Sequence, residues 1–395
     1  MSVLTDAQAM HDDLVRLRRD LHREPEVGLK LPRTQEKVLN ALAGLPLEIT
    51  TGTALSSVTG VLRGGRPGPT VLLRADMDGL PVTETTGVDY ASQTGTTMHA
   101  CGHDLHTAAL VGAAHLLGAR REEIAGNVVL MFQPGEEGYH GARYMIEEGV
   151  LDASGERAVA AYGIHVTSAV LPRGWWTTRR GPMMAAADVL RVTVKGAGGH
   201  ASAPHRAKDP IPVACEMVTA LQTLVTRKFD VFDPVVVTVG QFHAGTRDNV
   251  IPDDAAFEAT IRSFSEWAHA RVKDEVVRLV RGVAEAHGLG VEVDYADGYP
   301  VTVNHDAETD FTAKVIEETS ENFLWAPYPI TGAEDFSYVL NAVPGTFALL
   351  SACPPELDPG TAAYNHSPEA VFDDAVLPDA AAVLANLALS RLAAS

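Results

Sequence analysis

Residues 127–138 read Asn-Val-Val-Leu-Met-Phe-Gln-Pro-Gly-Glu-Glu-Gly. The apolar run at 128–132 predicts a buried strand, and Pro-Gly at 134–135 predicts the turn that ends it. Two adjacent carboxylates, Glu136 and Glu137, follow that turn. Ligands collect at strand ends in α/β proteins, so one glutamate could bind a metal ion while the other handles a proton. Read alone, the pair could equally be solvated glutamates on a polar loop.

Strands and helices alternate on both sides of this segment. Apolar strands are expected at 70–74 and 158–165, and a helix rich in Ala and Leu is expected at about 104–117. Near the end of the chain the pattern predicts a helix near 311–321, a strand near 346–350 and a helix after Pro378. This alternation favours a parallel or mixed sheet that helices cover on both faces.

The middle of the chain has a different pattern. A period-2 strand is followed by a helix that Asp209 could cap, then by two strands, a second helix and a last strand, at 189–194, 210–225, 235–239, 257–261, 267–287 and 291–295. The order β-α-β-β-α-β is that of a ferredoxin-like unit. We therefore predict an inserted domain at 185–298 and an outer domain built from residues 1–184 and 299–395.

The composition is that of a globular and strongly acidic chain. Its 395 residues are 46% hydrophobic and 21% charged, which excludes a disordered or fibrous protein. The net charge of −20 repels phosphate backbones and anionic membrane surfaces, so we expect no nucleic-acid or membrane partner. Three scattered cysteines predict no disulfide framework. Because no signal peptide and no run near ~20 apolar residues is visible, a cytoplasmic location is expected.

The densest group of potential metal ligands lies at 98–106, with one cysteine and three histidines. Cys101 and His103, two residues apart at the start of a helix, could bind the same ion. A buried free cysteine beside solvated histidines is the structural alternative. His165 follows an apolar strand and His366 lies in a polar loop, and either alone is more often a core or surface histidine than a ligand.

Polar residues in the middle unit are a third group of candidates. Glycines precede His200 at 196–199, but the spacing does not match a phosphate-binding loop. Glycine at this point would instead let the backbone approach a ligand closely. Asn249 and Arg262 lie near strands of the same unit, and Arg262 leaves the sheet face opposite its apolar neighbours. A solvated arginine is the alternative there.

Together these segments resemble one family in order and spacing. The chain is similar to the M20 family of metal-dependent amidohydrolases, in the subgroup of N-acyl-amino-acid and hippurate hydrolases and plant auxin-conjugate hydrolases. The resemblance covers nearly the whole chain. It rests on the runs 73–81, 98–103, 133–137, 163–166, 199–202, 249–252 and 332–336.

The resemblance implies a fold and a set of roles. The fold would be a metallo-exopeptidase-like α/β catalytic domain with an inserted ferredoxin-like α+β domain that acts as lid and dimerisation module. Two divalent metal ions, with Zn favoured and Mn, Co or Ni also compatible, would be bound by Cys101, His103, Glu137, His165 and His366. Glu136 would be the general base and His200 would polarise the scissile carbonyl. Asn249 and Arg262 would bind the substrate carboxylate, and Asp78 would support the metal ligands.

The activity implied is hydrolysis of N-acyl or N-aroyl amino acids to a carboxylic acid and a free amino acid, by metal-activated water. A dipeptidase or aminopeptidase on the same scaffold is the second interpretation. A non-catalytic binder of amino-acid conjugates is the third, and the retention of every expected ligand argues against it. The resemblance also implies a homodimer formed through the inserted domain, with His200 acting on the metal site of the partner subunit.

Overall fold

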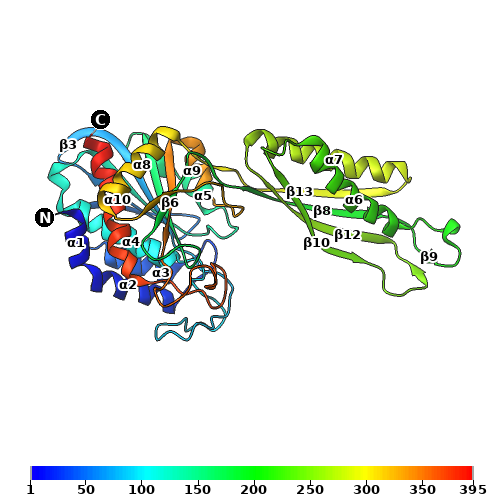
Figure 1. Cartoon of the computed structure of the whole chain (residues 1–395), viewed down its shortest axis with the longest axis horizontal. Coiled ribbons are helices and arrows are strands. Elements are labelled where there is room, and N and C mark those ends of the chain that lie inside the picture. Colours follow the sequence, from blue (N-terminus) through cyan, green and yellow to red (C-terminus); the bar gives the residue numbers. More distant parts are fainter. Residues whose placement is uncertain (1, 394–395) are drawn as a thin grey trace. The chain divides into compact units, whose positions relative to one another are not determined.

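The computed structural model describes residues 2–393, which form two compact units (Figure 1). The first unit contains residues 2–183, 303–328 and 335–393, and the second contains 184–302 and 329–334. The second unit therefore extends beyond the expected boundaries of 185 and 298. The additional segment belongs there because Ala185 N donates to the carbonyl oxygens of Ile330 and Gly332, at 3.0 and 2.9 Å.

The first unit is built on a mixed eight-stranded sheet with the order β1-β2-β4-β3-β5-β16-β6-β15. The central strands β4, β3, β5 and β16 run parallel, whereas the pairs β1–β2, β2–β4 and β16–β6 are antiparallel. The strands, in sheet order, are Leu47–Thr51, Val58–Arg63, Ala125–Gln133, Arg66–Asp76, Ala160–Thr167, Gly345–Ser351, Trp176–Thr178 and Phe323–Trp325. The parallel centre brings the carboxyl ends of β3, β4 and β5 to one edge of the sheet.

Helices cover both faces of this sheet (Figure 1). Helices α1, α2, α4, α8 and α10 lie on one side, and α5 and α9 pack together on the other. The helices of this unit, α1–α5 and α8–α10, are Val3–Ala9, His11–Arg23, Pro32–Ala41, His103–Ala119, Gly141–Glu147, Asp306–Thr319, Ser337–Ala342 and Leu377–Ala393. Helix α4 is buried along almost its whole length because it packs on the sheet beside α10 and is also covered by α2.

No apolar run long enough to span a membrane was expected from the sequence, but one helix meets that criterion. The segment Asp374–Ala393, which includes α10, is long and apolar enough by length and composition to span a membrane. However, 67% of its most apolar window is buried inside the first unit. Its apolar faces pack against α4 and α8, so other helices of the same unit already cover them.

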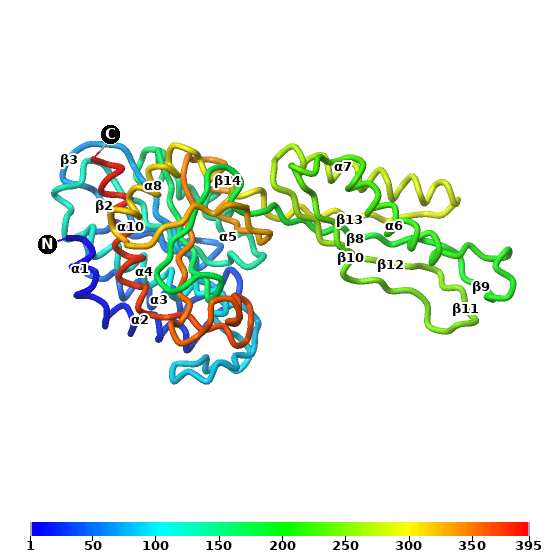
Figure 2. Tube along the Cα trace, viewed as in Figure 1, coloured from blue at the N-terminus to red at the C-terminus, as the bar shows by residue number. Residues whose placement is uncertain are grey.

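The second unit is a four-stranded antiparallel sheet with two helices on one face (Figure 2). The sheet order β13-β8-β12-β10 and the chain order β-α-β-β-α-β are those of a ferredoxin-like fold. A small pair, β9 and β11, lies beyond one end of this sheet. The elements β8, β9, α6, β10, β11, β12, α7 and β13 are Ala186–Lys195, Gly199–His200, Pro210–Lys228, Val235–Ala244, Val250–Ile251, Asp254–Ser263, Glu266–Ala286 and Gly290–Tyr299.

Most of these elements match the sequence patterns. Asp209 caps α6 as expected, with its side chain accepting a hydrogen bond from Ile211 N. The chain enters and leaves the second unit near the short strands β7 and β14, Gly181–Met184 and Thr302–Asn304. The strands that the sequence did not predict include β1, most of which is exposed at the edge of the large sheet, so its sequence carries no apolar alternation.

Candidate metal centre

The candidate ligands lie at the carboxyl ends of the parallel strands. Cys101 lies two residues before His103, which is the first residue of α4. His165 lies in β5, and Glu137 follows the turn after β4. Gly102, between Cys101 and His103, has φ +81°, and a Cβ on it would lie 2.4 Å from a side-chain carbon of Val166. Glycine is therefore required where the chain enters α4.

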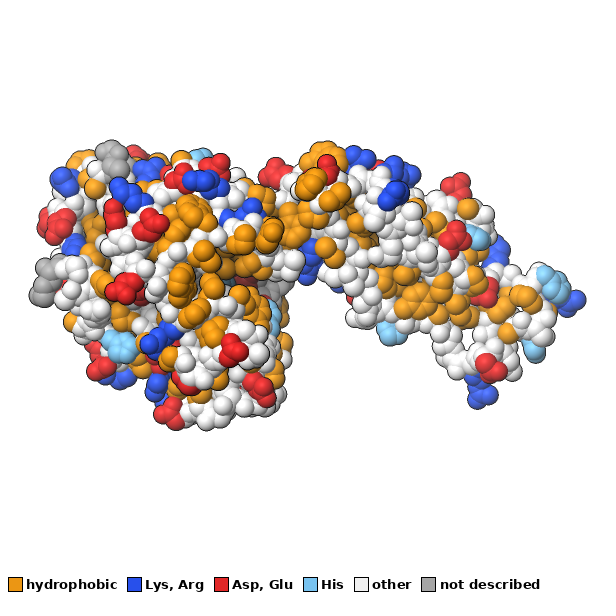
Figure 3. Space-filling model, in the orientation of Figure 1, with side chains coloured by type: hydrophobic (Ala, Val, Ile, Leu, Met, Phe, Trp, Pro, Cys, Tyr) orange, Lys and Arg blue, Asp and Glu red, His pale blue; other side chains and the backbone are white. Residues whose placement is uncertain are grey.

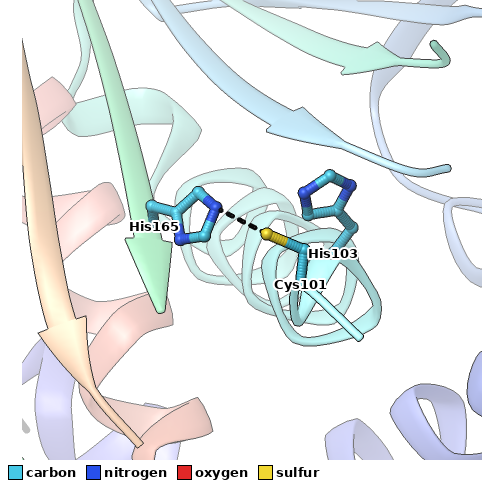
Figure 4. A group of neighbouring side chains, drawn as sticks. All are labelled: Cys101, His103 and His165. Carbon is cyan, nitrogen blue, oxygen red and sulfur yellow. Dashed lines mark hydrogen bonds between the residues drawn. The ribbon is translucent and has the colours of Figure 1, made fainter. Parts of the chain in front are cut away.

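Cys101 lies at the centre of the cluster. Its Sγ atom is 3.3 Å from Nε2 of His165 and 3.3 Å from Nε2 of His366. Figure 4 shows Cys101 and His103 at the start of the α4 helix, facing His165 on its strand. Two groups of possible ligands share the thiol: Cys101, His103 and His165 form one, and Cys101, Glu137 and His366 form the other. In each group the ligand atoms lie within 4.8 Å of one another. The structure thus brings all five expected ligands together.

The donor set suits a divalent transition metal. A thiolate, imidazoles and a carboxylate are the ligands that Zn²⁺ prefers. His103 is fully buried, yet its ring nitrogens lie 3.6 Å from Asp78 and 3.7 Å from Asp76, beyond hydrogen-bond distance. Within residues 2–393, both ring nitrogens of His103 are buried without a hydrogen-bond partner, and the buried Oε1 of Glu137 contacts Nε2 of His366 at 3.2 Å. A bound cation would satisfy these atoms.

The ligand side chains also shift one another's proton equilibria. Burial alone would lower the pKa of His103, but Asp76 and Cys101 raise it well above its ordinary value. Hydrogen bonds to Cys101 and Glu137 raise the pKa of His366 to about 10. Burial would raise the pKa of Glu137, but His366 and His103 lower it. Binding of a cation to these ligands should therefore be accompanied by release of protons.

Asp78 holds the turn that carries both glutamates. Its Oδ1 accepts the backbone N–H of Glu136 at 2.9 Å, and its Oδ2 accepts that of Glu137 at 3.0 Å. The Glu136 side chain is 6% exposed and lies in a group with His103 and Glu137. Glu136 is therefore well placed to exchange a proton with a group bound at the centre.

A buried hydrogen-bonded network around Arg74 borders the metal centre. The sequence analysis did not assign this network a role. Arg74 Nη1 donates to Asp76 at 2.6 Å, and Arg74 Nη2 donates to Asp335 at 3.0 Å. Gln133 also donates to Asp335, at 2.7 Å. The available signal was the position of Arg74 within the apolar run of β3, since a buried arginine requires carboxylate partners.

The second unit carries the other three predicted residues, and it does not bring all of them together. His200 is exposed on β9, and Asn249 precedes β11, with Asn249 O accepting from Ala201 N at 3.1 Å. Arg262 lies near the opposite end of β12, paired with Ala187 in β8. The nine strand residues from Asp254 to Arg262 span about 26 Å. One small carboxylate therefore cannot reach both Asn249 and Arg262 of the same unit.

The orientation of the His200 ring follows from its neighbour. The Ser202 backbone N–H donates to His200 Nδ1 at 3.2 Å, and the Ser202 hydroxyl lies 2.9 Å from the same atom. Because Nδ1 accepts, the proton of the neutral ring is on Nε2. His200 therefore presents an N–H donor to solvent, as a group that stabilises a carbonyl oxygen must.

Comparison with known proteins identifies the family. The profile of peptidase family M20/M25/M40 matches residues 72–390. The chain belongs to the M20 family. Among solved M20 structures, a dinuclear metal-binding peptidase from Bacillus subtilis, the YXEP protein, superposes with a TM-score of 0.83 at 31% identity, covering 98% of this chain and 99% of its own. This M20 chain is accordingly a metal-binding hydrolase.

Curated relatives of the M20 chain have three kinds of names. Thermostable carboxypeptidase 2 of Saccharolobus solfataricus is 39% identical over 388 residues, covering 97% of this chain and 96% of its own. N-acetylcysteine deacetylase of Bacillus subtilis is 34% identical over 383 residues, covering 97% of each chain. IAA-amino acid hydrolase ILR1-like 2 of Arabidopsis thaliana is 35% identical over 386 residues, covering 96% of this chain and 85% of its own.

Proposed function

We propose that this protein hydrolyses the amide bond of N-acyl or N-aroyl amino acids, giving a carboxylic acid and a free amino acid. The observation that carries the proposal is the cluster around Cys101, in which two groups of metal ligands share one thiolate beside the buried Glu136. The names of the relatives support the substrate class. A carboxypeptidase, an N-acetylcysteine deacetylase and an IAA-amino acid hydrolase all cleave an amide whose nitrogen belongs to an amino acid.

The residues divide the work of amide hydrolysis. Two divalent ions, with zinc favoured by the thiolate and imidazole ligands, would supply Lewis acidity that activates water and polarises the carbonyl. Glu136 takes the proton of the attacking water and returns it to the leaving nitrogen. Asp78 fixes the backbone of Glu136 and Glu137 while this happens. His200 donates a hydrogen bond from its Nε2–H to the carbonyl oxygen, where negative charge develops.

The substrate carboxylate needs a positive partner, and Arg262 is suited to this role. Its guanidinium is half-buried and donates to Thr260 and to the Ile261 carbonyl, and no carboxylate within residues 2–393 forms an ion pair with it. Burial lowers the pKa of Arg262, and this effect outweighs the opposing charge of Asp188. A planar guanidinium binds a carboxylate through two parallel hydrogen bonds. Arg262→Ala should weaken carboxylate substrates far more than the corresponding amides, and equal losses would assign Arg262 a structural role.

The positions within the second unit favour a homodimer. Arg262 lies opposite Ala187, close to where the chain enters the unit, whereas His200 and Asn249 lie beyond the other end of the sheet. Figure 3 shows histidine and basic side chains gathered at this far end. A second copy could offer its acidic centre to these residues, and the exposed strand edges of β10 and β13 are possible pairing surfaces. His200 and Asn249 would then act on the metal centre of the partner subunit.

The test is a substrate panel with metal-reconstituted protein. We expect turnover of hippurate and of N-acetyl amino acids, little turnover of the matching amides without a free carboxylate, and loss of turnover in Glu136→Gln. The name of the carboxypeptidase relative favours one alternative, a peptidase that requires a free C-terminal carboxylate. N-blocked peptides and free dipeptides in the same panel distinguish the two. Turnover of free dipeptides alone would overturn the proposal.

A further inference from the structure

His106 lies one turn along α4 from His103 and is fully buried, and both of its ring nitrogens are engaged. Its Nδ1 is 2.6 Å from Asp76 Oδ1, and its Nε2 accepts the backbone N–H of Val166 at 2.7 Å. A backbone N–H can only donate, so Nε2 must accept and the ring proton must be on Nδ1. Asp76 accepts that proton. The structure thus fixes one neutral tautomer of His106.

This arrangement occupies both ring nitrogens of His106, so His106 is not available as a metal ligand, although His106 and Asp76 lie close enough to His103 to share an ion. Both oxygens of Asp76 accept hydrogen bonds, Oδ1 from His106 and Oδ2 from Arg74. The two side chains therefore form a support for the centre.

The hydrogen bonds that begin at Asp76 and His106 continue through Val166 to the expected ligand His165. Val166 donates its N–H to His106, and its carbonyl oxygen accepts from His165 Nδ1 at 2.7 Å. That bond leaves Nε2 of His165 unprotonated and directed at Cys101. The His106 ring also contacts both imidazoles of this group: it packs edge-on against His165 at 4.6 Å between centroids, and it stacks on His103 at 5.4 Å.

We propose that His106 is a positioning residue for one of the two ion sites. It sets the backbone of Val166, and thereby the orientation of His165, so the site formed by Cys101, His103 and His165 depends on it. The site formed by Cys101, Glu137 and His366 is built from other loops and does not. This inference rests on the metal centre of the proposed function. It adds a residue that affects one of the two ion sites and not the other.

The test compares substitutions that keep different atoms of the ring. His106→Asn retains a donor near Nδ1 for Asp76 but has no atom at the Nε2 position. His106→Gln places an acceptor near the Nε2 position for Val166 N–H. His115→Asn is the matched control, since His115 lies on the same helix and bonds to the Ala41 carbonyl, outside the centre. Cobalt(II) binding to each metal-free protein is measured by calorimetry and by dialysis with elemental analysis.

Wild type and His115→Asn should bind two cobalt ions. His106→Asn should bind one ion with affinity close to wild type and the other about 10- to 100-fold more weakly, as is typical when a partner behind a histidine ligand is lost. His106→Gln should recover part of the second affinity. Because Cys101 belongs to both groups, the thiolate-to-cobalt absorption should persist in His106→Asn at one ion per chain.

Three results would overturn the inference. Wild-type affinity for both ions in His106→Asn would show that His106 positions neither site. Equal weakening of both ions would indicate general damage to the fold. Absence of any cobalt binding in wild type would refute the proposed metal centre, and the inference with it, and is thus distinguishable from the first two. If circular dichroism shows that His106→Asn is unfolded, His106→Gln carries the test, and two wild-type affinities there would contradict the inference.

Discussion

Asp78 Oδ2 accepts the backbone N–H of Glu137 at 3.0 Å. A side chain just after β3 therefore holds the loop that follows β4. Its other oxygen accepts Glu136 N at 2.9 Å. Asp78→Ala removes both acceptors and should reduce metal affinity and turnover together, by about 10- to 100-fold. Asp78→Asn keeps one acceptor and should lose less. Metal content and kcat of the two variants check this, and wild-type values in Asp78→Ala would contradict it.

Glu136 and Glu137 should respond differently to the same substitution, although they are adjacent. Glu137 belongs to a ligand group with Cys101 and His366, so Glu137→Gln should lower metal affinity. Glu136→Gln should leave bound metal near the wild-type level and reduce turnover by about 10²- to 10⁴-fold, because only proton transfer is lost. Elemental analysis and kcat, measured on the same samples, separate the two effects. Equal metal loss in both variants would refute this division of labour.

Cys101 should behave as a metal ligand and Cys215 as a dispensable residue. The thiol of Cys101 belongs to both ligand groups, so Cys101→Ser should lower the binding of both ions and reduce activity. Cys215 is exposed on α6 in the second unit, and Cys215→Ala is therefore the matched control. Full metal occupancy with normal turnover in Cys101→Ser would show that the thiol is not a ligand.

A buried group of ionisable side chains, His22, Glu84 and Asp104, should make the free energy of unfolding depend on pH. His22 Nδ1 lies 2.7 Å from Asp104, and His22 Nε2 lies 3.3 Å from Glu84. Burial alone would lower the pKa of His22, but these two carboxylates raise it above its ordinary value of 6.5. Burial would raise the pKa of Glu84, but hydrogen bonds from His22 and Ser92 lower it to about 2.

The sign of the pH effect follows from these shifts. The contribution of His22 is complete below pH 6.5 and is lost as the pH rises through its raised pKa. The contribution of Glu84 is complete above pH 4.5 and is lost only as the pH falls towards about 2. His22→Asn should therefore cost more free energy of unfolding at about pH 5.5 than at about pH 9. Urea titrations of wild type and variant at both pH values measure this, and an equal cost at both would contradict it.

Four of the five expected metal ligands, which the structure brings together, follow a local signal in the sequence. Cys101 and His103 precede an apolar helix, Glu137 follows a strand and a Pro-Gly turn, and His165 ends an apolar run. Parallel strands then bring these positions to one edge of the sheet. Such signals require no knowledge of distant contacts.

The supporting residues could not be assigned in this way, because their partners are distant in the chain. His22 meets Asp104 across 82 residues, and Arg74 meets Asp335 across 261. The motif that contains His106 was visible, but nothing in the sequence showed which of its histidines bind metal and which hold the ligands. That distinction depends on Val166 N–H, a backbone group that carries no sequence signal.

The separation of His200 and Arg262 within the second unit leads to the last prediction. If His200 acts on the metal centre of the partner subunit, Glu136→Ala and His200→Ala homodimers should each be nearly inactive. A hybrid dimer should contain one site with Glu136 and His200 both intact and one site that lacks both. Random mixing makes half of the dimers hybrids, each with one working site, so activity should recover to about a quarter of wild type. Co-expression with two different affinity tags isolates the hybrid, which alone should show about half of wild-type activity. Recovery near zero in the purified hybrid would mean that His200 acts within its own chain or takes no part in the reaction.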